Sequence, residues 1–141
     1  MKKTKHGGTN YARLMKYIGD MNADNNHKRY TDGGIHLPLV FEYLYYNDYK
    51  GCSVYSITHW GEMNGDAMRD PDITFSVDHE SKTIEPQTFQ NDYLGLYQEV
   101  YRQDDDGTWL YSNRLRIDLD QHLYDWLNMI EQASFQLEKA E

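Results

Sequence analysis

Residues able to bind a metal ion or move a proton gather in two short segments of this chain. The first segment, residues 59–75, contains one histidine and four carboxylates: His59, Glu62, Asp66, Asp70 and Asp72. Such side chains suit a divalent cation or general acid–base chemistry, but their spacing matches no metal-binding motif, the calcium loop included. The alternative is a turn built on Asn64-Gly65, in which carboxylates cap backbone amides. We favour this turn, and we predict neither a bound metal nor a cofactor.

The second segment is a polar run directly before an apolar stretch: Gln90, Asn91, Asp92 and Tyr93. These side chains either tie the ends of a loop together or line a groove beside the first segment. The two segments are expected to meet, in which case a double-mutant cycle between Asp66 and Asp92 would show coupling. The candidate functional residues are His59, Glu62, Asp66, Arg69, Asp70, Asn91 and Asp92.

The sequence carries no motif of a known catalytic type. It has no Gly-x-Ser-x-Gly elbow, no glycine-rich phosphate loop and no zinc-binding pattern of cysteines and histidines. Cys52 is the single cysteine, and its sequence neighbourhood suggests no activating base, so a buried strand thiol is expected. The sequence therefore does not favour an enzyme.

Two helices are expected to position these segments. Near the start, four apolar residues recur at helical spacing: Tyr11, Leu14, Met15 and Ile18. Thr9 or Asn10 would cap this helix, and Gly19 would end it. Near the end, a longer stripe runs over about five turns: Leu119, Leu123, Trp126, Leu127, Ile130, Ala133 and Leu137. Asp118 and Gln121 would form a capping box at the start of this second helix.

Strand patterns fill the region between the helices. Apolar or alternating runs predict strands over residues 38–46, 52–60, 72–78, 83–89 and 108–112. Residues 93–102 favour a strand with a helix as the alternative, and residues 20–34 are typical of a polar loop. The short connections indicate an antiparallel meander. The predicted fold is α+β, with a meander sheet of about five strands and an N-terminal and a long C-terminal helix packed on one face.

Length and composition suggest one domain. The 141 residues suit a single core over residues 9–141, preceded by a flexible basic tail at residues 1–8. One cysteine fits a reducing compartment, no apolar run is long enough for a membrane helix, and no apolar stretch follows the basic start as in a signal peptide. We therefore expect a cytoplasmic protein with no membrane contact.

Charge is divided unevenly along the chain. Residues 1–30 carry a net charge of +5 and residues 31–141 a net charge of −14, which sum to −9. An acidic body repels a phosphate backbone. Direct nucleic-acid binding is therefore expected only through the basic N-terminus.

Residues 37–101 resemble a known family at a series of short motifs. The motifs are Leu37-Pro38-Leu39-Val40, His59, Gly65-Asp66, Met68-Arg69-Asp70-Pro71, Thr74-Phe75, Gln90-Asn91-Asp92-Tyr93-Leu94-Gly95 and Tyr97-Gln98-Glu99-Val100-Tyr101. They resemble a family of small bacterial domains of unknown function, found largely on plasmids, phage-like islands and conjugative elements. The resemblance implies an accessory protein of a mobile element that meets a host defence or regulatory factor. It implies no activity.

Three functions compete for this chain. The leading hypothesis is a non-catalytic module that binds another protein, since tyrosine is favoured at interfaces and the chain has 13 tyrosines. It predicts an exposed patch formed by tyrosines such as Tyr45, Tyr46, Tyr49 and Tyr111. One alternative is an acidic DNA mimic that inhibits a host defence or nucleic-acid-binding protein. The other is a small metal-dependent hydrolase that uses the loop from His59 to Asp72.

Overall fold

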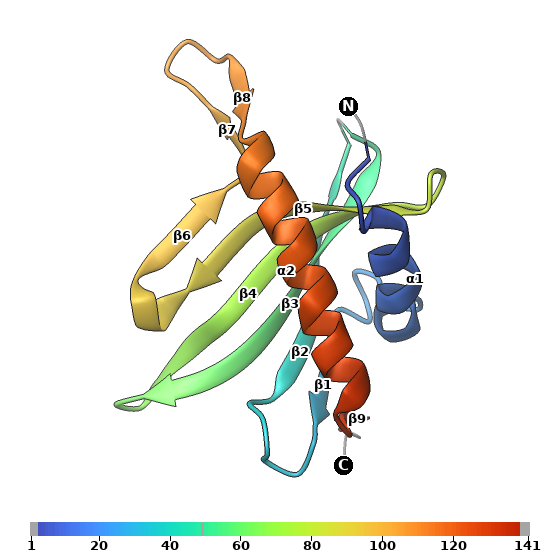
Figure 1. Cartoon of the computed structure of the whole chain (residues 1–141), viewed down its shortest axis with the longest axis vertical. Helices are drawn as coiled ribbons and strands as arrows, with labels where there is room; N and C mark the ends of the chain where they lie inside the picture. The colour runs from blue at the N-terminus through green and yellow to red at the C-terminus, as the bar shows by residue number, and fades with distance from the viewer. Residues whose placement is uncertain (1–2, 49, 139–141) are drawn as a thin grey trace.

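The computed structural model describes residues 3–48 and 50–138 (Figure 1). Its helices are α1 (Gly7–Ile18), the short 3-10 helix η1 (Asp92–Leu94) and α2 (Asn113–Gln132). Its strands are β1 (His27–Thr31), β2 (Leu39–Asn47), β3 (Cys52–Met63), β4 (Asp66–Asp78), β5 (Thr83–Asn91), β6 (Leu96–Glu99), β7 (Tyr101–Gln103), β8 (Trp109–Tyr111) and β9 (Gln136–Leu137).

One antiparallel sheet forms the body of the molecule. Its seven strands have the order β6-β5-β4-β3-β2-β1-β9, so β1 to β6 follow one another as a meander. β7 and β8 pair with each other as a separate hairpin that projects from the sheet (Figure 1). The predicted meander is confirmed, but the prediction of about five strands was too low.

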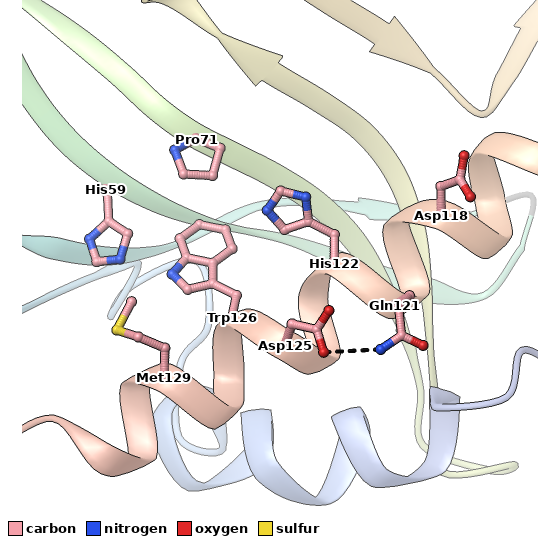
Figure 2. A pocket seen from close by; sticks show the side chains of 8 residues that line it. All are labelled: His59, Pro71, Asp118, Gln121, His122, Asp125, Trp126 and Met129. Atoms are coloured by element: carbon pink, nitrogen blue, oxygen red, sulfur yellow. Dashed lines mark hydrogen bonds between the residues drawn. The ribbon is translucent and has the colours of Figure 1, made fainter.

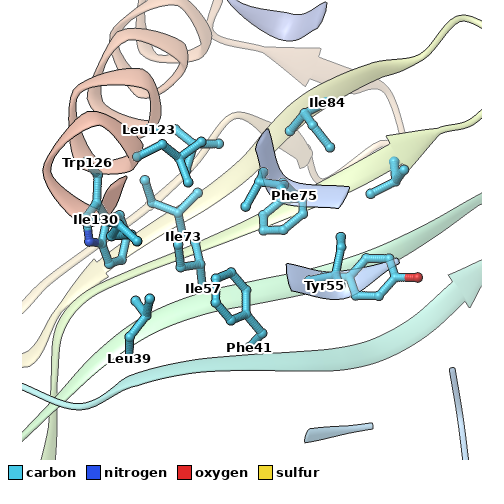
Figure 3. Packing of buried hydrophobic residues seen from close by; sticks show 14 of the residues in the cluster. Leu39, Phe41, Tyr55, Ile57, Ile73, Phe75, Ile84, Leu123, Trp126 and Ile130 are labelled. Atoms are coloured by element: carbon cyan, nitrogen blue, oxygen red, sulfur yellow. The ribbon is translucent and has the colours of Figure 1, made fainter. Parts of the chain in front are cut away.

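Both α-helices cover the same face of the sheet. Alternate residues of β3 and β4 point to this face because side chains along a strand alternate, and Ile57, Ile73 and Phe75 are fully buried there. Figure 3 shows these side chains packed against Leu123 and Ile130 of α2. Neither α1 nor α2 lies on the opposite face, which we call the open face.

The segment of residues 59–75 is a long hairpin rather than a loop between strands. β3 and β4 pair from Ser53 with Val77 out to Met63 with Asp66. Only Asn64 and Gly65 connect the two strands, and their φ angles of 54° and 85° are those of a two-residue hairpin turn. Because so tight a turn consumes only two residues, the polar residues on either side of it belong to paired strands.

The ends of α2 differ from the prediction. Ser112 caps the helix, since its Oγ accepts a hydrogen bond from the backbone N–H of Leu115 at 3.2 Å. Asp118 and Gln121 therefore lie inside the helix, and the predicted capping box was wrong. The backbone becomes extended at Ala133, so Leu137 lies in β9 and not on the helical stripe.

The first helix also starts earlier than expected. α1 begins at Gly7, where the backbone N–H of His6 donates to the Asp120 carboxylate of α2 at 2.9 Å. Gly7 and Gly8 are thus helical, although the sequence suggested that they belong to the tail at residues 1–8. Residues 1 and 2 of that tail lie outside the described residues.

Two other segments were only partly predicted. Residues 20–34 contain β1, because residues 27–30 pair with β2 and bury Tyr30. Residues 93–102 are mostly extended, as favoured, but η1 and the positive φ of Gly95, 60°, precede β6. Within the part of the chain that the structure describes, no helix combines the length and the apolar character needed to cross a membrane.

Candidate functional site

The β3–β4 hairpin sends its candidate residues to opposite faces of the sheet. His59 and Pro71 line a pocket against α2, whereas Arg69 and Asp72 line a pocket on the open face. His59 and Asp72 therefore do not converge on one site. No three His, Cys, Asp or Glu side chains come together as a metal site requires, within the described residues. The two ends of the loop that the hydrolase alternative would use therefore line different pockets.

The two polar segments identified in the sequence lie side by side. Asp92 Oδ2 accepts a hydrogen bond from the backbone N–H of Arg69 at 2.8 Å, and Arg69 Nη1 lies 3.6 Å from the same oxygen. Asn91 Nδ2 donates to Asp70 Oδ1 at 3.0 Å. The bond from the Arg69 N–H is the main reason why the pKa of Asp92 is lowered. We call these four residues the clasp, since they hold the hairpin against η1.

The remaining candidates, Glu62 and Asp66, stay near the hairpin tip. Both are exposed. The backbone carbonyl of Glu62 accepts a hydrogen bond from the Tyr93 hydroxyl at 3.3 Å, and Asp66 directly follows the turn. Neither carboxylate takes part in the clasp.

A pocket of about 350 Å³ opens on the open face between β2 and β6. Its floor is polar, with side chains of Ser56, Thr74, Thr88, Gln90 and Asp72. Asp72 is only 9% exposed, and its Oδ2 accepts a hydrogen bond from Thr58 Oγ1 at 2.6 Å. Burial raises the pKa of Asp72, although the Thr58 hydrogen bond and the Arg69 charge act against that rise.

Large side chains surround this polar floor. Tyr45 and Tyr97 are 53% and 55% exposed, and Leu44 lies beside them at the pocket. The guanidinium carbon of Arg69 lies 5.3 Å from the centre of the Trp60 ring, a cation–π contact. The open face therefore combines a carboxylate floor with an aromatic rim.

The predicted tyrosine patch is composed differently from the prediction. Tyr45, Tyr46 and Tyr111 are exposed, but Tyr46 pairs with Ser53 on the other face from Tyr45, and Tyr111 lies in the β7–β8 hairpin. Tyr49 lies outside the described residues. Tyr45 instead shares the open-face pocket with Tyr97, because β2 and β6 both contribute to it.

Sequence reasoning missed the floor of the open-face pocket. Alternation along residues 72–78 places Asp72, Thr74 and Ser76 on one side, which is typical of a solvated face. Asp72 is nevertheless buried, because the strands on either side bring long side chains over it. A strand carrying small polar residues and one carboxylate on the same side was the only available signal.

The second pocket lies between α2 and the β3–β4 hairpin, and we call it the helix-side pocket (Figure 2). Its volume is about 540 Å³, and His59, Pro71, His122 and Trp126 are among the residues that line it. His59 is 6% exposed and its Nδ1 lies 3.0 Å from the carbonyl oxygen of Leu37. Burial lowers the pKa of both His59 and His122, which favours neutral imidazoles.

Cys52 and the acidic residues add no further chemistry. Cys52 begins β3 and is partly exposed rather than buried, and desolvation raises the pKa of its thiol, which disfavours the reactive thiolate. Acidic residues occur on separate elements, with Asp66 at one hairpin turn and Asp104 to Asp106 at another. Figure 1 shows these hairpins projecting toward opposite ends of the molecule.

A comparison with protein families shows which family the chain belongs to. Residues 9–136 match the model of a domain of unknown function, DUF6908. The chain belongs to the DUF6908 family. The match includes both α-helices and most of the sheet, so this DUF6908 domain extends beyond the resemblance over residues 37–101. No curated protein and no solved structure matches the chain.

Proposed function

We propose that this DUF6908 domain is a non-catalytic module that binds a basic segment of another protein on its open face. The observation that carries the proposal is the open-face pocket, where the exposed rings of Tyr45 and Tyr97 stand beside the buried carboxylate of Asp72. Exposed aromatic side chains supply contact area at protein interfaces, and neither helix covers them here.

Charge favours a cationic partner. Glu42 and Asp72 line the pocket together with one cation, Arg69. The Arg69 guanidinium already faces the Trp60 ring and the Asp92 carboxylate. A lysine or arginine from a partner would meet an unbalanced negative charge at Asp72, and the net charge of −9 would speed its approach.

This function is preferred over the two alternatives for geometric reasons. A DNA mimic needs carboxylates in rows, and the hydrolase alternative needs His59 and Asp72 in one pocket, whereas these two residues line different pockets. Protein binding needs only the aromatic rim and the acidic floor. A role as a bacterial, cytoplasmic accessory protein of a mobile element belongs to the same proposal and rests on the sequence resemblance.

Two-dimensional NMR of the labelled chain, titrated with a lysine-rich peptide and a glutamate-rich peptide of equal length, tests the proposal. We expect the lysine-rich peptide to shift resonances of Trp60, Asp72 and Tyr97. Tyr97→Ala should weaken this binding about tenfold, the usual scale for an aromatic side chain at the centre of an interface.

Tyr46→Ala is the matched control. Tyr46 is exposed to nearly the same degree as Tyr97, 53% against 55%, but it lies on the opposite face of the sheet. Equal binding of the glutamate-rich peptide, or shifts confined to the β7–β8 hairpin, would overturn the proposal.

A further inference from the structure

Two buried nitrogen atoms in the helix-side pocket have no hydrogen-bond partner among the described residues. They are His59 Nε2 and Trp126 Nε1, from β3 and α2 respectively. Each residue is only 6% exposed, and their ring centres are 5.1 Å apart. Figure 2 shows both rings turned toward a common space beside Met129. Buried polar groups without partners are uncommon and destabilising, so a pair of them in one pocket points to a missing partner.

The two nitrogen atoms have complementary roles. Since His59 Nδ1 faces the carbonyl oxygen of Leu37, which can only accept, the proton of a neutral imidazole lies on Nδ1. His59 Nε2 is then a bare acceptor. Trp126 Nε1–H can only donate. A single ligand group with one donor and one acceptor would satisfy both.

The rest of the pocket limits the size and charge of such a ligand. A volume of about 540 Å³ lies within the range of small-molecule sites. Pro71, His122 and Trp126 offer flat or apolar walls, as Figure 2 shows. Asp118 and Asp125 line the pocket from α2, and none of its lining residues in the described part of the chain is Lys or Arg, so an anionic ligand would be repelled.

We infer that the helix-side pocket binds an uncharged planar ring whose edge carries adjacent N–H and C=O groups, such as a nucleobase without phosphate. The N–H of the ring donates to His59 Nε2, and its C=O accepts from Trp126 Nε1–H. The ring lies between the flat walls of the pocket. This inference is independent of the open face and of the proposed protein binding.

Entry to the inner pocket requires one side chain to move. Both nitrogen atoms are closed off from solvent, and the Met129 side chain lies beside them (Figure 2). Methionine is unbranched and changes rotamer easily, so it can swing aside as a ring enters. Met129→Ala should therefore tighten binding, whereas Met63→Ala, at an exposed position on the hairpin tip, should not change it.

The indole N–H resonance of Trp126 reports directly on the proposed contact. The chain has three tryptophans, so Trp60→Phe and Trp109→Phe assign the remaining signal to Trp126. Titration with uracil should shift this signal. 1,3-Dimethyluracil lacks the N–H and should bind at least about tenfold more weakly, the scale of one buried hydrogen bond. Uridine 5′-monophosphate adds negative charge and should also bind at least about tenfold more weakly.

His59→Phe should weaken uracil binding about tenfold, and His79→Phe, in the exposed turn after β4, is its matched control. Binding of 1,3-dimethyluracil as strong as that of uracil would overturn the inference. An unshifted Trp126 signal at saturating uracil would overturn it as well, and would leave a trapped water as the bridge between the two nitrogens. If His59→Phe fails to fold, the uracil affinities of Met129→Ala and Met63→Ala are compared instead. Equal affinities would contradict the proposed entry of the ring past Met129.

Discussion

Individual polar side chains in the core of this domain fall into two classes. The Asp72 carboxylate is buried but has the Thr58 hydroxyl as a partner at 2.6 Å. His59 Nε2 and Trp126 Nε1 are buried and have no partner within residues 3–48 and 50–138. Unfavourably buried polar groups of this kind are expected at functional sites, where a protein gives up some stability for binding. The helix-side pocket contains these two nitrogen atoms and the open-face pocket contains the Asp72 carboxylate, which is why we assign a binding role to both pockets.

Asp72→Asn is expected to stabilise the domain at pH 7, by about 1 kcal/mol. Because burial raises the pKa of Asp72, the folded state disfavours the carboxylate. This penalty is complete above the raised pKa and disappears as the pH falls toward the ordinary value of 3.8. An asparagine oxygen can still accept from Thr58. Urea unfolding at several pH values should therefore show that Asp72→Asn is more stable than the wild type, by a difference that shrinks as the pH falls.

Asp66→Asn provides the control for Asp72→Asn, because Asp66 is exposed at the hairpin tip. Its stability should match that of the wild type within about 0.5 kcal/mol at each pH. If the wild type were more stable than Asp72→Asn at neutral pH, the attraction between Asp72 and Arg69 would outweigh the cost of burying the Asp72 carboxylate.

Side chains at the ends of elements make several of the hydrogen bonds that fix one element to the next. The clasp fixes the β3–β4 hairpin to η1 through Asp92 and Asn91. Ser112 caps α2 directly after β8. Such contacts determine where an element starts and which neighbour it meets, so single substitutions at these positions test the boundaries.

Asp92→Ala should lower the free energy of unfolding by about 1–2 kcal/mol, since it leaves the backbone N–H of Arg69 without its acceptor. Asp66→Ala should have almost no effect, and the two changes should add, contrary to the coupling expected from the sequence. Coupling of about 0.5–1 kcal/mol should instead appear in a double-mutant cycle between Asp70 and Asn91, which share a hydrogen bond of 3.0 Å. Additivity at this second pair would contradict the clasp.

Ser112→Ala should lower stability by about 1 kcal/mol, because it removes the side-chain acceptor for the first turn of α2. Asp118→Ala should change stability by less than about 0.5 kcal/mol, since Asp118 lies inside the helix and caps nothing. Thermal unfolding of both variants distinguishes a start of α2 at Ser112 from the start that the sequence predicted at Asp118. The reverse order of effects would place the helix start at Asp118.

The whole molecule is one sheet with a packed face and a face left without helices. Phe41, Ile57, Ile73 and Phe75 lie under α1 and α2 in a single core. The β7–β8 hairpin stands outside this core, with Trp109 and Tyr111 exposed. Stability should therefore depend on the packed face, while the open face and the hairpin remain free to contact other molecules.

Phe75→Ala should lower the free energy of unfolding by about 3–5 kcal/mol, as expected for a fully buried ring whose removal leaves a cavity. Trp109→Ala removes a larger ring but should change stability by less than about 0.5 kcal/mol, because Trp109 is exposed on the projecting hairpin. Urea unfolding measures both values. A large loss for Trp109→Ala would show that the hairpin belongs to the cooperative core.

Periodicity and turn chemistry in the sequence determined the fold class and much of the meander. Alternation predicted most of β3 and the second half of β4, the helical stripes predicted α1 and α2, and Asn64-Gly65 was identified as a tight-turn pair. These features are local, so a short window of sequence contains them. β1 and β9 escaped notice because their short strands gain stability only from pairing with each other and with β2.

Only the tertiary structure decided which candidate residues share a site. Thr58 pairs with Asp72, so alternation along β3 puts the neighbouring His59 on the opposite face from Asp72, although the two lie close in the sequence. Tyr45 and Tyr97 meet across the sheet, and Trp126 reaches His59 from a helix far along the chain. Such meetings depend on strand order and helix placement, which arise from packing over the whole molecule. The sequence by itself therefore specified most of the elements, because their patterns are local, and the packing of distant elements created both pockets.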